Sequence, residues 1–446
     1  MARVTDMTHG RPIRLILLFS LPLMLGSVFQ QLYTIVDTII IGRGVGMQAL
    51  ASIGAADWIN WLVLWGLQGF TQGFAILAAQ EFGAGAYDRL RRVLAMIIKL
   101  SCWFGIAVTI ISLLLIRPLL TLLHTDPAVF GGAQTYLYVQ FGGSLIIIAY
   151  NMAAAVLRCL GDSKTPLLAI IAASFANIAL DLLFVMGFGW GIFGASFATV
   201  LAQLIAFLLC LRSLRRLPFV QLTKADWKTD PAILLHLCRL GIPTGLQMSM
   251  ITLGGMVLQS VLNGFGVVFV AGYTAANKLY GILESASVAF GYAMTAYMGQ
   301  NRGARIDAGI RAVLALSAGF TAAIVTAMLL AGKPLLGLFL STEEAGAADA
   351  LAVAYQYLMV LMAFLFALFM LQAYRSSLQG LGEMTVPTLS GFAEMLMRMG
   401  AALVLPVFIG KSGVFFAEGA AWVCAAALNL VWYYMRIGKI KRDMLK

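Results

Sequence analysis

The chain has 446 residues, of which 61% are apolar and only 11% are charged. Because about a quarter of the residues of a soluble domain are charged, this composition excludes a soluble domain carrying a small anchor and indicates an integral membrane protein. The formal net charge of +11 is compatible with a nucleic-acid partner, but the positions of the basic residues favour another explanation.

The first apolar run follows three arginines and resembles a signal peptide. It extends from Leu15 to Ile41 without a small-residue cleavage site, so we interpret it as a retained membrane helix. Eleven further apolar runs follow, each long enough to cross a hydrocarbon core of about 30 Å. The sequence therefore predicts an all-α integral membrane protein with twelve spans. These are 15–41, 49–79, 93–117, 134–158, 166–187, 191–213, 236–262, 267–299, 311–340, 352–380, 386–409 and 413–436.

Lysines and arginines gather in the loops on one side of these spans. Twenty-two fall on the side that holds both termini, Arg158, Arg302 and Arg375 among them, and four on the other. The positive-inside rule then predicts a multi-pass plasma-membrane protein with both termini in the cytoplasm. The same bias explains the net charge, so we expect no nucleic-acid partner.

The two halves of the chain resemble each other. QEFGA (80–84) matches QNRGA (300–304) at an offset of 220, and LGDSKTP (160–166) matches LGEMTVP (381–387) at an offset of 221. Six spans per half is an even number, so both halves have the same orientation, which is the parallel repeat found in transporters. The predicted organisation is an N-terminal six-helix lobe (1–211), a basic cytoplasmic linker (212–235) and a C-terminal six-helix lobe (236–446). TDP (229–231) is the expected helix start after the linker.

With twelve predicted helices in two halves, Pro22 in the first helix and these paired loops, the sequence resembles the MATE (multidrug and toxic compound extrusion) transporters. The similarity is greatest to the prokaryotic branch with acidic residues in its N-terminal half. The resemblance implies a V-shaped pair of lobes and efflux of amphipathic, often cationic compounds driven by inward Na⁺ or H⁺. It also implies an ion-coupling site, whose members fall here on Asp37, Asn177, Asp181 and Thr199.

The positions of these residues support the same site. With both termini inside, Asp37, Asn177, Asp181 and Thr199 all fall in the outer halves of their predicted helices, and Asn177 and Asp181 share a helix face. An ionised side chain near the bilayer centre costs about 2.5–3.5 kcal/mol on insertion scales. Two neighbouring carboxylates resist joint ionisation unless a cation or a proton joins them. The alternative is that each aspartate only accepts hydrogen bonds from neighbouring helices.

The internal repeat helps to distinguish an ion-coupling site from aspartates that only accept structural hydrogen bonds. At the offset of 221, the counterparts of Asp37, Asn177 and Asp181 are Leu258, Arg398 and Ala402. The acidic cluster therefore has no counterpart in the second half, which favours a single coupling site over symmetric scaffolding.

Other polar residues lie within the predicted spans. Glu394 and Arg398, four residues apart, are expected to form a mutually satisfied pair. Glu284 has no charged residue one turn away, and it is expected either to bind a cationic substrate or a second proton, or to be a hydrogen-bonded structural acid. The candidate substrate-cavity residues are Tyr33, Asn151, Glu284 and Gln372.

The predicted function is secondary active multidrug efflux by antiport, with a lipid or lipid-linked flippase of the same superfamily as the alternative. A flippase would favour a basic cavity. A membrane-embedded enzyme is a third possibility, but no catalytic motif is present, so we expect a transporter. We expect no cofactor beyond the coupling ion, Na⁺ or H⁺, and no metal site other than one for Na⁺. The expected partners are small-molecule drugs or toxic compounds and membrane lipids, and the expected state is a monomer.

Overall fold

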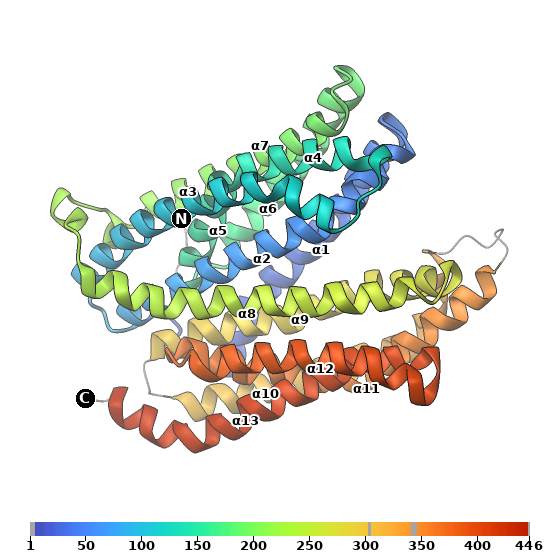
Figure 1. The fold of residues 1–446 in the computed structure, drawn as a ribbon. Helices are drawn as coiled ribbons and strands as arrows, with labels where there is room; N and C mark the ends of the chain where they lie inside the picture. Colours follow the sequence, from blue (N-terminus) through green and yellow to red (C-terminus); the bar gives the residue numbers. More distant parts are fainter. Residues whose placement is uncertain (1–4, 302–304, 340–345, 445–446) are drawn as a thin grey trace. The chain divides into compact units, whose positions relative to one another are not determined.

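The computed structural model describes residues 5–301, 305–339 and 346–444. These residues fold into helices joined by short turns, and no strand occurs within the described ranges (Figure 1). Of the basic residues named above, Arg302 lies outside the described ranges. The α-helices are α1 (Pro12–Gly44), α2 (Met47–Gly83), α3 (Tyr87–Leu122), α4 (Pro127–Gly142), α5 (Ser144–Cys159), α6 (Lys164–Asp181), α7 (Gly191–Arg215), α8 (Pro231–Asn263), α9 (Val267–Asn301), α10 (Ile306–Gly337), α11 (Ala347–Gly380), α12 (Thr385–Ile409) and α13 (Phe416–Met444). The shorter helical turns are η1 (Leu182–Gly187), η2 (Pro218–Val220), η3 (Lys224–Trp227) and η4 (Lys411–Phe415).

Each predicted span is helical over its described residues, which for the span 311–340 excludes residue 340. The fourth span is broken into α4 and α5, which meet at an angle of 50°. The break lies at Gly143, where a Cβ atom would come within 2.5 Å of the Val200 side chain on α7. Only glycine allows α7 to approach this closely. The all-helical membrane fold predicted from the sequence is confirmed.

By length and composition, ten of the described helices could cross a membrane, or eleven if the bent pair counts as one span. The remaining predicted span is α9, which is as long as the others but less apolar because it contains polar residues that include Lys278 and Glu284. The twelve predicted spans therefore correspond to these eleven and α9.

The chain divides into two compact units. Unit 1 comprises Met1–Asp6 and Pro22–Gly245, and unit 2 comprises Met7–Leu21 and Leu246–Lys446. The chain passes from one unit to the other after Asp6, within α1 after Leu21 and within α8 after Gly245. The lobe bounds expected from the sequence, with a linker at 212–235, remain a prediction. The boundary within α1 falls just before Pro22 and the boundary within α8 falls two residues after Pro243; these prolines correspond at the repeat offset of 221.

The first part of α8 packs tightly on α2 within unit 1. A Cβ atom on Gly73 of α2 would lie 2.6 Å from both the carbonyl oxygen of Leu240 and the Cα atom of Gly241. Small residues allow membrane helices to approach closely enough for backbone contact. This contact explains why α8 up to Gly245 belongs with unit 1.

We predict that Gly73→Ala destabilises the protein by about 1–3 kcal/mol, because the added methyl group overpacks a contact made by rigid backbone. The loss is measured as a fall in the thermal unfolding temperature of the purified protein in detergent. Gly54→Ala is the matched control, since Gly54 lies on the same helix and a Cβ atom added there would have no neighbour within 4 Å. Equal stability of the two variants would contradict the proposed role of this contact.

The linker packs against α3 of unit 1. The Lys99 ammonium donates hydrogen bonds to the Trp227 carbonyl oxygen (2.6 Å) and the Thr229 hydroxyl (2.9 Å). Asp230 accepts hydrogen bonds from the backbone N–H groups of Ala232 and Ile233 and so caps α8. The predicted helix start at TDP is therefore confirmed.

Asp226 anchors the same linker. Its Oδ2 atom accepts hydrogen bonds from the backbone N–H (2.8 Å) and the hydroxyl (2.7 Å) of Thr223, and lies 3.7 Å from the Arg91 guanidinium. Burial alone would raise the pKa of this carboxyl, but the Thr223 hydrogen bonds and the charges of Arg91 and Arg92 outweigh burial and lower the pKa below its usual value. The folded linker therefore stabilises the ionised form of Asp226.

Because the folded pKa of Asp226 lies below the unfolded one, its contribution to linker stability is present above the usual Asp pKa of about 3.9. It is lost as the pH falls through the lower, folded value. We predict that Asp226→Asn speeds proteolysis of residues 219–229 at pH 7, and that this difference from wild type vanishes only under strongly acidic conditions. Asp126→Asn, which instead removes the side-chain cap of α4, is the control and should leave cleavage of the linker unchanged.

Candidate functional site

Within unit 1, an apolar cluster joins the elements that carry the predicted ion site. Ile40 and Ile41 of α1, Val185 of η1 and Ala195 of α7 are buried in it, and Ile178 of α6 packs against it. Asn177 directly precedes Ile178, and Asp37 lies one turn before Ile41. The packing of these apolar side chains therefore brings α1, α6 and α7 together near the polar residues.

The carboxyl groups of Asp37 and Asp181 are neighbours that interact with each other. Asp181 is 0% exposed and Asn177 is 1% exposed. With both carboxyl groups ionised, neither oxygen of Asp181 nor Oδ1 of Asp37 accepts a hydrogen bond from a described residue, and both amide atoms of Asn177 are without a partner among these residues. Buried polar atoms are almost always paired, so this group of atoms requires an explanation beyond packing. Its oxygen donors suit a hard cation or a proton.

Two further groups, which the sequence analysis missed, extend this cluster. Asp57 of α2 interacts with Asp37, and Tyr136 of α4 interacts with both aspartates. The amide of Asn60 donates a hydrogen bond to the Tyr136 hydroxyl (3.3 Å). The available signal was an aspartate within the second predicted span, but its proximity to Asp37 depends on how α1 packs on α2.

The structure places Tyr33 beside the acidic pair, since it interacts with Asp37 and Asp181. Thr199 lies on α7, and its hydroxyl donates to the Ala195 carbonyl oxygen one turn earlier (3.2 Å). The unpaired atoms of Asn177 and Asp181 receive no hydrogen bond from it. Of the four predicted ion-site residues, the structure thus makes the carboxyl groups of Asp37 and Asp181 interacting neighbours, with Asn177 one turn before Asp181.

The other candidate cavity residues are divided between the units. Asn151 lies on α5 of unit 1, where its amide donates to the Ile147 carbonyl oxygen (2.9 Å). Gln372 lies on α11 of unit 2, next to Gly291 of α9. Glu284 lies on α9 of unit 2 and interacts with Tyr280 one turn before it. Their role in substrate binding remains a prediction.

Unit 2 contains a buried chain of ion pairs. The guanidinium of Arg398 contacts Glu394 (3.0 Å) and Glu418 (2.8 Å), and the guanidinium of Arg375 contacts the other oxygen of Glu394 (2.6 Å). The predicted Glu394–Arg398 pair is therefore confirmed. The assignment of Arg375 to a loop was wrong, because it lies inside α11, is 4% exposed and has its charge balanced by Glu394.

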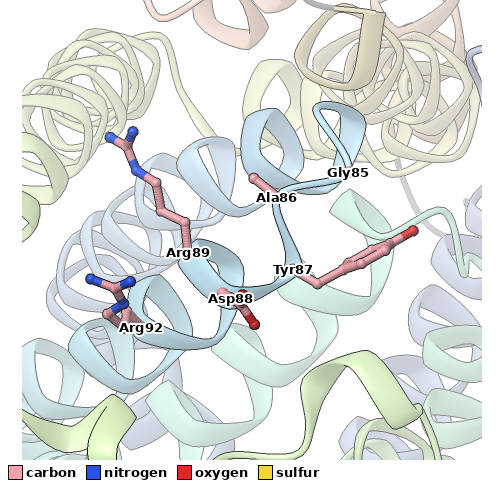
Figure 2. Close-up of a pocket in the computed structure, with 6 residues that line it drawn as sticks. All are labelled: Gly85, Ala86, Tyr87, Asp88, Arg89 and Arg92. Carbon is pink, nitrogen blue, oxygen red and sulfur yellow. The ribbon is translucent and has the colours of Figure 1, made fainter.

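A separate hollow lies at the turn between α2 and α3 (Figure 2). It has a volume of about 380 Å³, and Arg89 at its edge pairs with Glu81 (3.2 Å). Its lining residues are Gly85, Ala86, Tyr87, Asp88, Arg89 and Arg92. Since none of them belongs to the acidic cluster, this hollow is not part of the candidate ion site.

Comparison with protein families agrees with the internal repeat. A family model described as MatE matches residues 22–183 and again residues 243–404. The two matches are shifted by 221 residues, which is the offset found between the halves of the sequence.

Among curated proteins, the chain is 36% identical over 305 residues to "Probable multidrug resistance protein YpnP" of Bacillus subtilis, covering 67% of each chain. It is 26% identical to "Probable multidrug resistance protein YoeA" of the same organism, over 95% of this chain and 94% of that one. It is 23% identical to "Multidrug export protein MepA" of Staphylococcus saprophyticus, over 94% and 93% of the two chains.

Among solved structures, a MOP superfamily transporter from Pyrococcus furiosus superposes with a TM-score of 0.90 at 25% identity, over 98% of this chain and 99% of that one. The structure described as "Crystal structure of MATE in complex with MaL6" has the same TM-score at 24% identity, over 99% and 100% of the two chains. The second likeness bears on the fold alone.

Proposed function

Since the chain belongs to the MATE family of membrane transporters, we propose that it is a secondary active multidrug efflux antiporter. It exports amphipathic, often cationic compounds in exchange for inward Na⁺ or H⁺. The family assignment confirms the resemblance seen in the sequence and makes the chain a transporter and not an enzyme.

The observation that carries the coupling proposal is the buried acidic pair of unit 1. Asp37 and Asp181 come from different helices, and Asp181 is fully buried; when both groups are ionised, neither carboxyl oxygen of Asp181 accepts a hydrogen bond from a described residue. Two adjacent carboxylates in a low-dielectric site repel each other, and a bound cation or a shared proton removes that repulsion. The pair therefore has the chemistry that a coupling ion requires.

Ion binding at this pair supplies the coupling. With no ion bound, repulsion separates the Asp37 and Asp181 carboxylates and with them α1 and α6. A bound cation or proton neutralises the pair and favours closer packing of the two helices. Because a ligand shifts a conformational equilibrium by its differential affinity for the two states, inward ion movement drives the helix arrangement from which the drug leaves outward.

The relatives' names support the substrate class, since YpnP, YoeA and MepA are described as multidrug resistance or export proteins. A flippase is less well supported, because recognition of lipid phosphates favours unpaired cations. The buried guanidinium groups of Arg375 and Arg398 are instead paired with glutamates. We further propose that the transporter is a monomer in the plasma membrane, in contact with lipids and with both termini in the cytoplasm, as the loop charges predict.

Efflux of a cationic dye from cells tests the transport function itself. Cells that produce the chain should accumulate less ethidium than cells carrying an empty vector, and collapse of the proton and sodium gradients should remove the difference. Equal dye accumulation in producing and empty-vector cells, for a panel of cationic and neutral amphipathic dyes, would contradict multidrug efflux.

A further inference from the structure

The elements around the acidic pair of unit 1 have counterparts in unit 2. A shift of 221 residues carries α1 onto α8, α6 onto α12, and α7 onto η4 and α13, and it carries the first residue of α6, Lys164, onto the first residue of α12, Thr385. The two family-model matches keep the same shift. The same three-helix frame therefore exists twice, and its contents can be compared.

In unit 2, an arginine stands where unit 1 has Asn177. The Arg398 side chain is 5% exposed, and oxygen atoms from all three counterpart elements surround its guanidinium. Nη1 donates to the Ile251 carbonyl oxygen of α8 (3.1 Å), and Nη2 donates to Glu394 of α12 (3.0 Å). Both Nη2 (2.8 Å) and Nε (3.1 Å) donate to Glu418 of α13.

We propose that Arg398 is a tethered cation, which fills in unit 2 the place that a coupling ion takes in unit 1. The comparison with an ion rests on the proposed function, whereas the contacts of Arg398 do not. Glu394 and Glu418 balance the charges of Arg398 and Arg375, because Arg375 contacts the second oxygen of Glu394. Unit 2 therefore keeps the ion-bound arrangement of its frame permanently and needs no ion from solution.

The Arg398 guanidinium has more hydrogen-bond partners than an ion pair on a helix surface requires. A pair at positions i and i+4 needs only Glu394 and Arg398, yet every guanidinium nitrogen of Arg398 is engaged by an oxygen, and the partners come from three elements. Glu284 of α9 also interacts with Arg398. At Gly254 of α8, a Cβ atom would lie 3.2 Å from the Met395 Cα atom and 3.4 Å from Nη1 of Arg398. The α8 backbone at Gly254 thus lies directly against the Arg398 guanidinium.

A free guanidinium ion tests whether the tethered one acts as a bound cation. Arg398→Ala removes the charge and leaves space for the ion, and a ligand that binds only the folded state stabilises it by mass action. In detergent, millimolar guanidinium chloride should restore about half or more of the melting temperature lost in Arg398→Ala once its concentration is well above Kd. Potassium chloride at equal ionic strength should not, and wild type and the surface variant Arg216→Ala, whose side chain is exposed, should show no saturable gain.

An equal response of Arg398→Ala to guanidinium and potassium, or failure to fold even with guanidinium, would overturn the proposal. A second comparison avoids the large space left by alanine. Arg398→Lys keeps a cation and should have a clearly higher melting temperature than Arg398→Gln, whereas equal melting temperatures would show that the charge is dispensable. These readouts involve neither transport nor Asp37 and Asp181. A failure of ion-coupled efflux and a failure of guanidinium rescue are therefore separate results.

Discussion

Replacing Asp181 with asparagine should lower ion-driven efflux by about 5- to 150-fold, the change that corresponds to a typical coupling free energy of about 1–3 kcal/mol. Asparagine keeps the size of the side chain but removes the charge, so the pair with Asp37 no longer gains from binding a cation or a proton. Asp37→Asn should have an effect of the same order, because either substitution leaves a single carboxylate in the pair. The measurement is the initial rate of dye efflux from cells, normalised to the amount of protein in the membrane.

The control for this pair is Asp126→Asn, since Asp126 caps α4 outside the acidic cluster. It should transport at the wild-type rate. Asp57→Asn tests whether a third carboxylate contributes to coupling, because Asp57 interacts with Asp37 but is absent from the family pattern found in the sequence. If Asp181→Asn and Asp37→Asn transported as fast as Asp126→Asn, the ion site would have to lie elsewhere.

The largest effect on stability is expected in unit 2. Removing one partner of a buried ion pair costs about 3–5 kcal/mol, because an uncompensated charge stays behind. Glu394 contacts two buried guanidinium groups, so Glu394→Gln should destabilise the protein by an amount in this range. The measurement is the thermal or denaturant midpoint of the purified protein in detergent.

Asp88→Asn is the matched control for Glu394→Gln. Asp88 also pairs with an arginine, Arg91, but its side chain is 83% exposed, and surface pairs contribute about 0–1 kcal/mol. A midpoint for Glu394→Gln that equals that of Asp88→Asn would show that the buried chain of ion pairs contributes nothing specific.

Much of the fold followed from the sequence because hydrocarbon imposes a simple rule. Backbone N–H and C=O groups in lipid must form hydrogen bonds within their own segment. A long apolar run such as 15–41 is therefore expected to be a helix, and α1 lies there in the structure. The repeat was equally visible, since paired loop segments keep their spacing. The break at Gly143 was not visible, because it depends on the approach of α7, which no local pattern records.

The ion site was predictable only in part. Asp37 and Asp181 stood out because a carboxylate within an apolar run is costly, and the structure brings them together. Asp57 has the same local signature, but nothing in the sequence indicates that it faces Asp37. Arg375 shows the opposite error: it looked like a loop charge near the end of a span, and only the position of Glu394 on α12 reveals that it is a buried partner.

The role proposed for the Asp37–Asp181 pair is to bind the coupling ion. The most direct measurement is drug transport in proteoliposomes under an imposed Na⁺ gradient and, separately, an imposed pH gradient, for wild type and for Asp181→Asn. We expect at least one gradient to drive uphill drug movement by wild type and neither gradient to drive it in Asp181→Asn. Gradient-driven transport by Asp181→Asn at the wild-type rate, or the absence of any response of an active wild type to both gradients, would contradict this role.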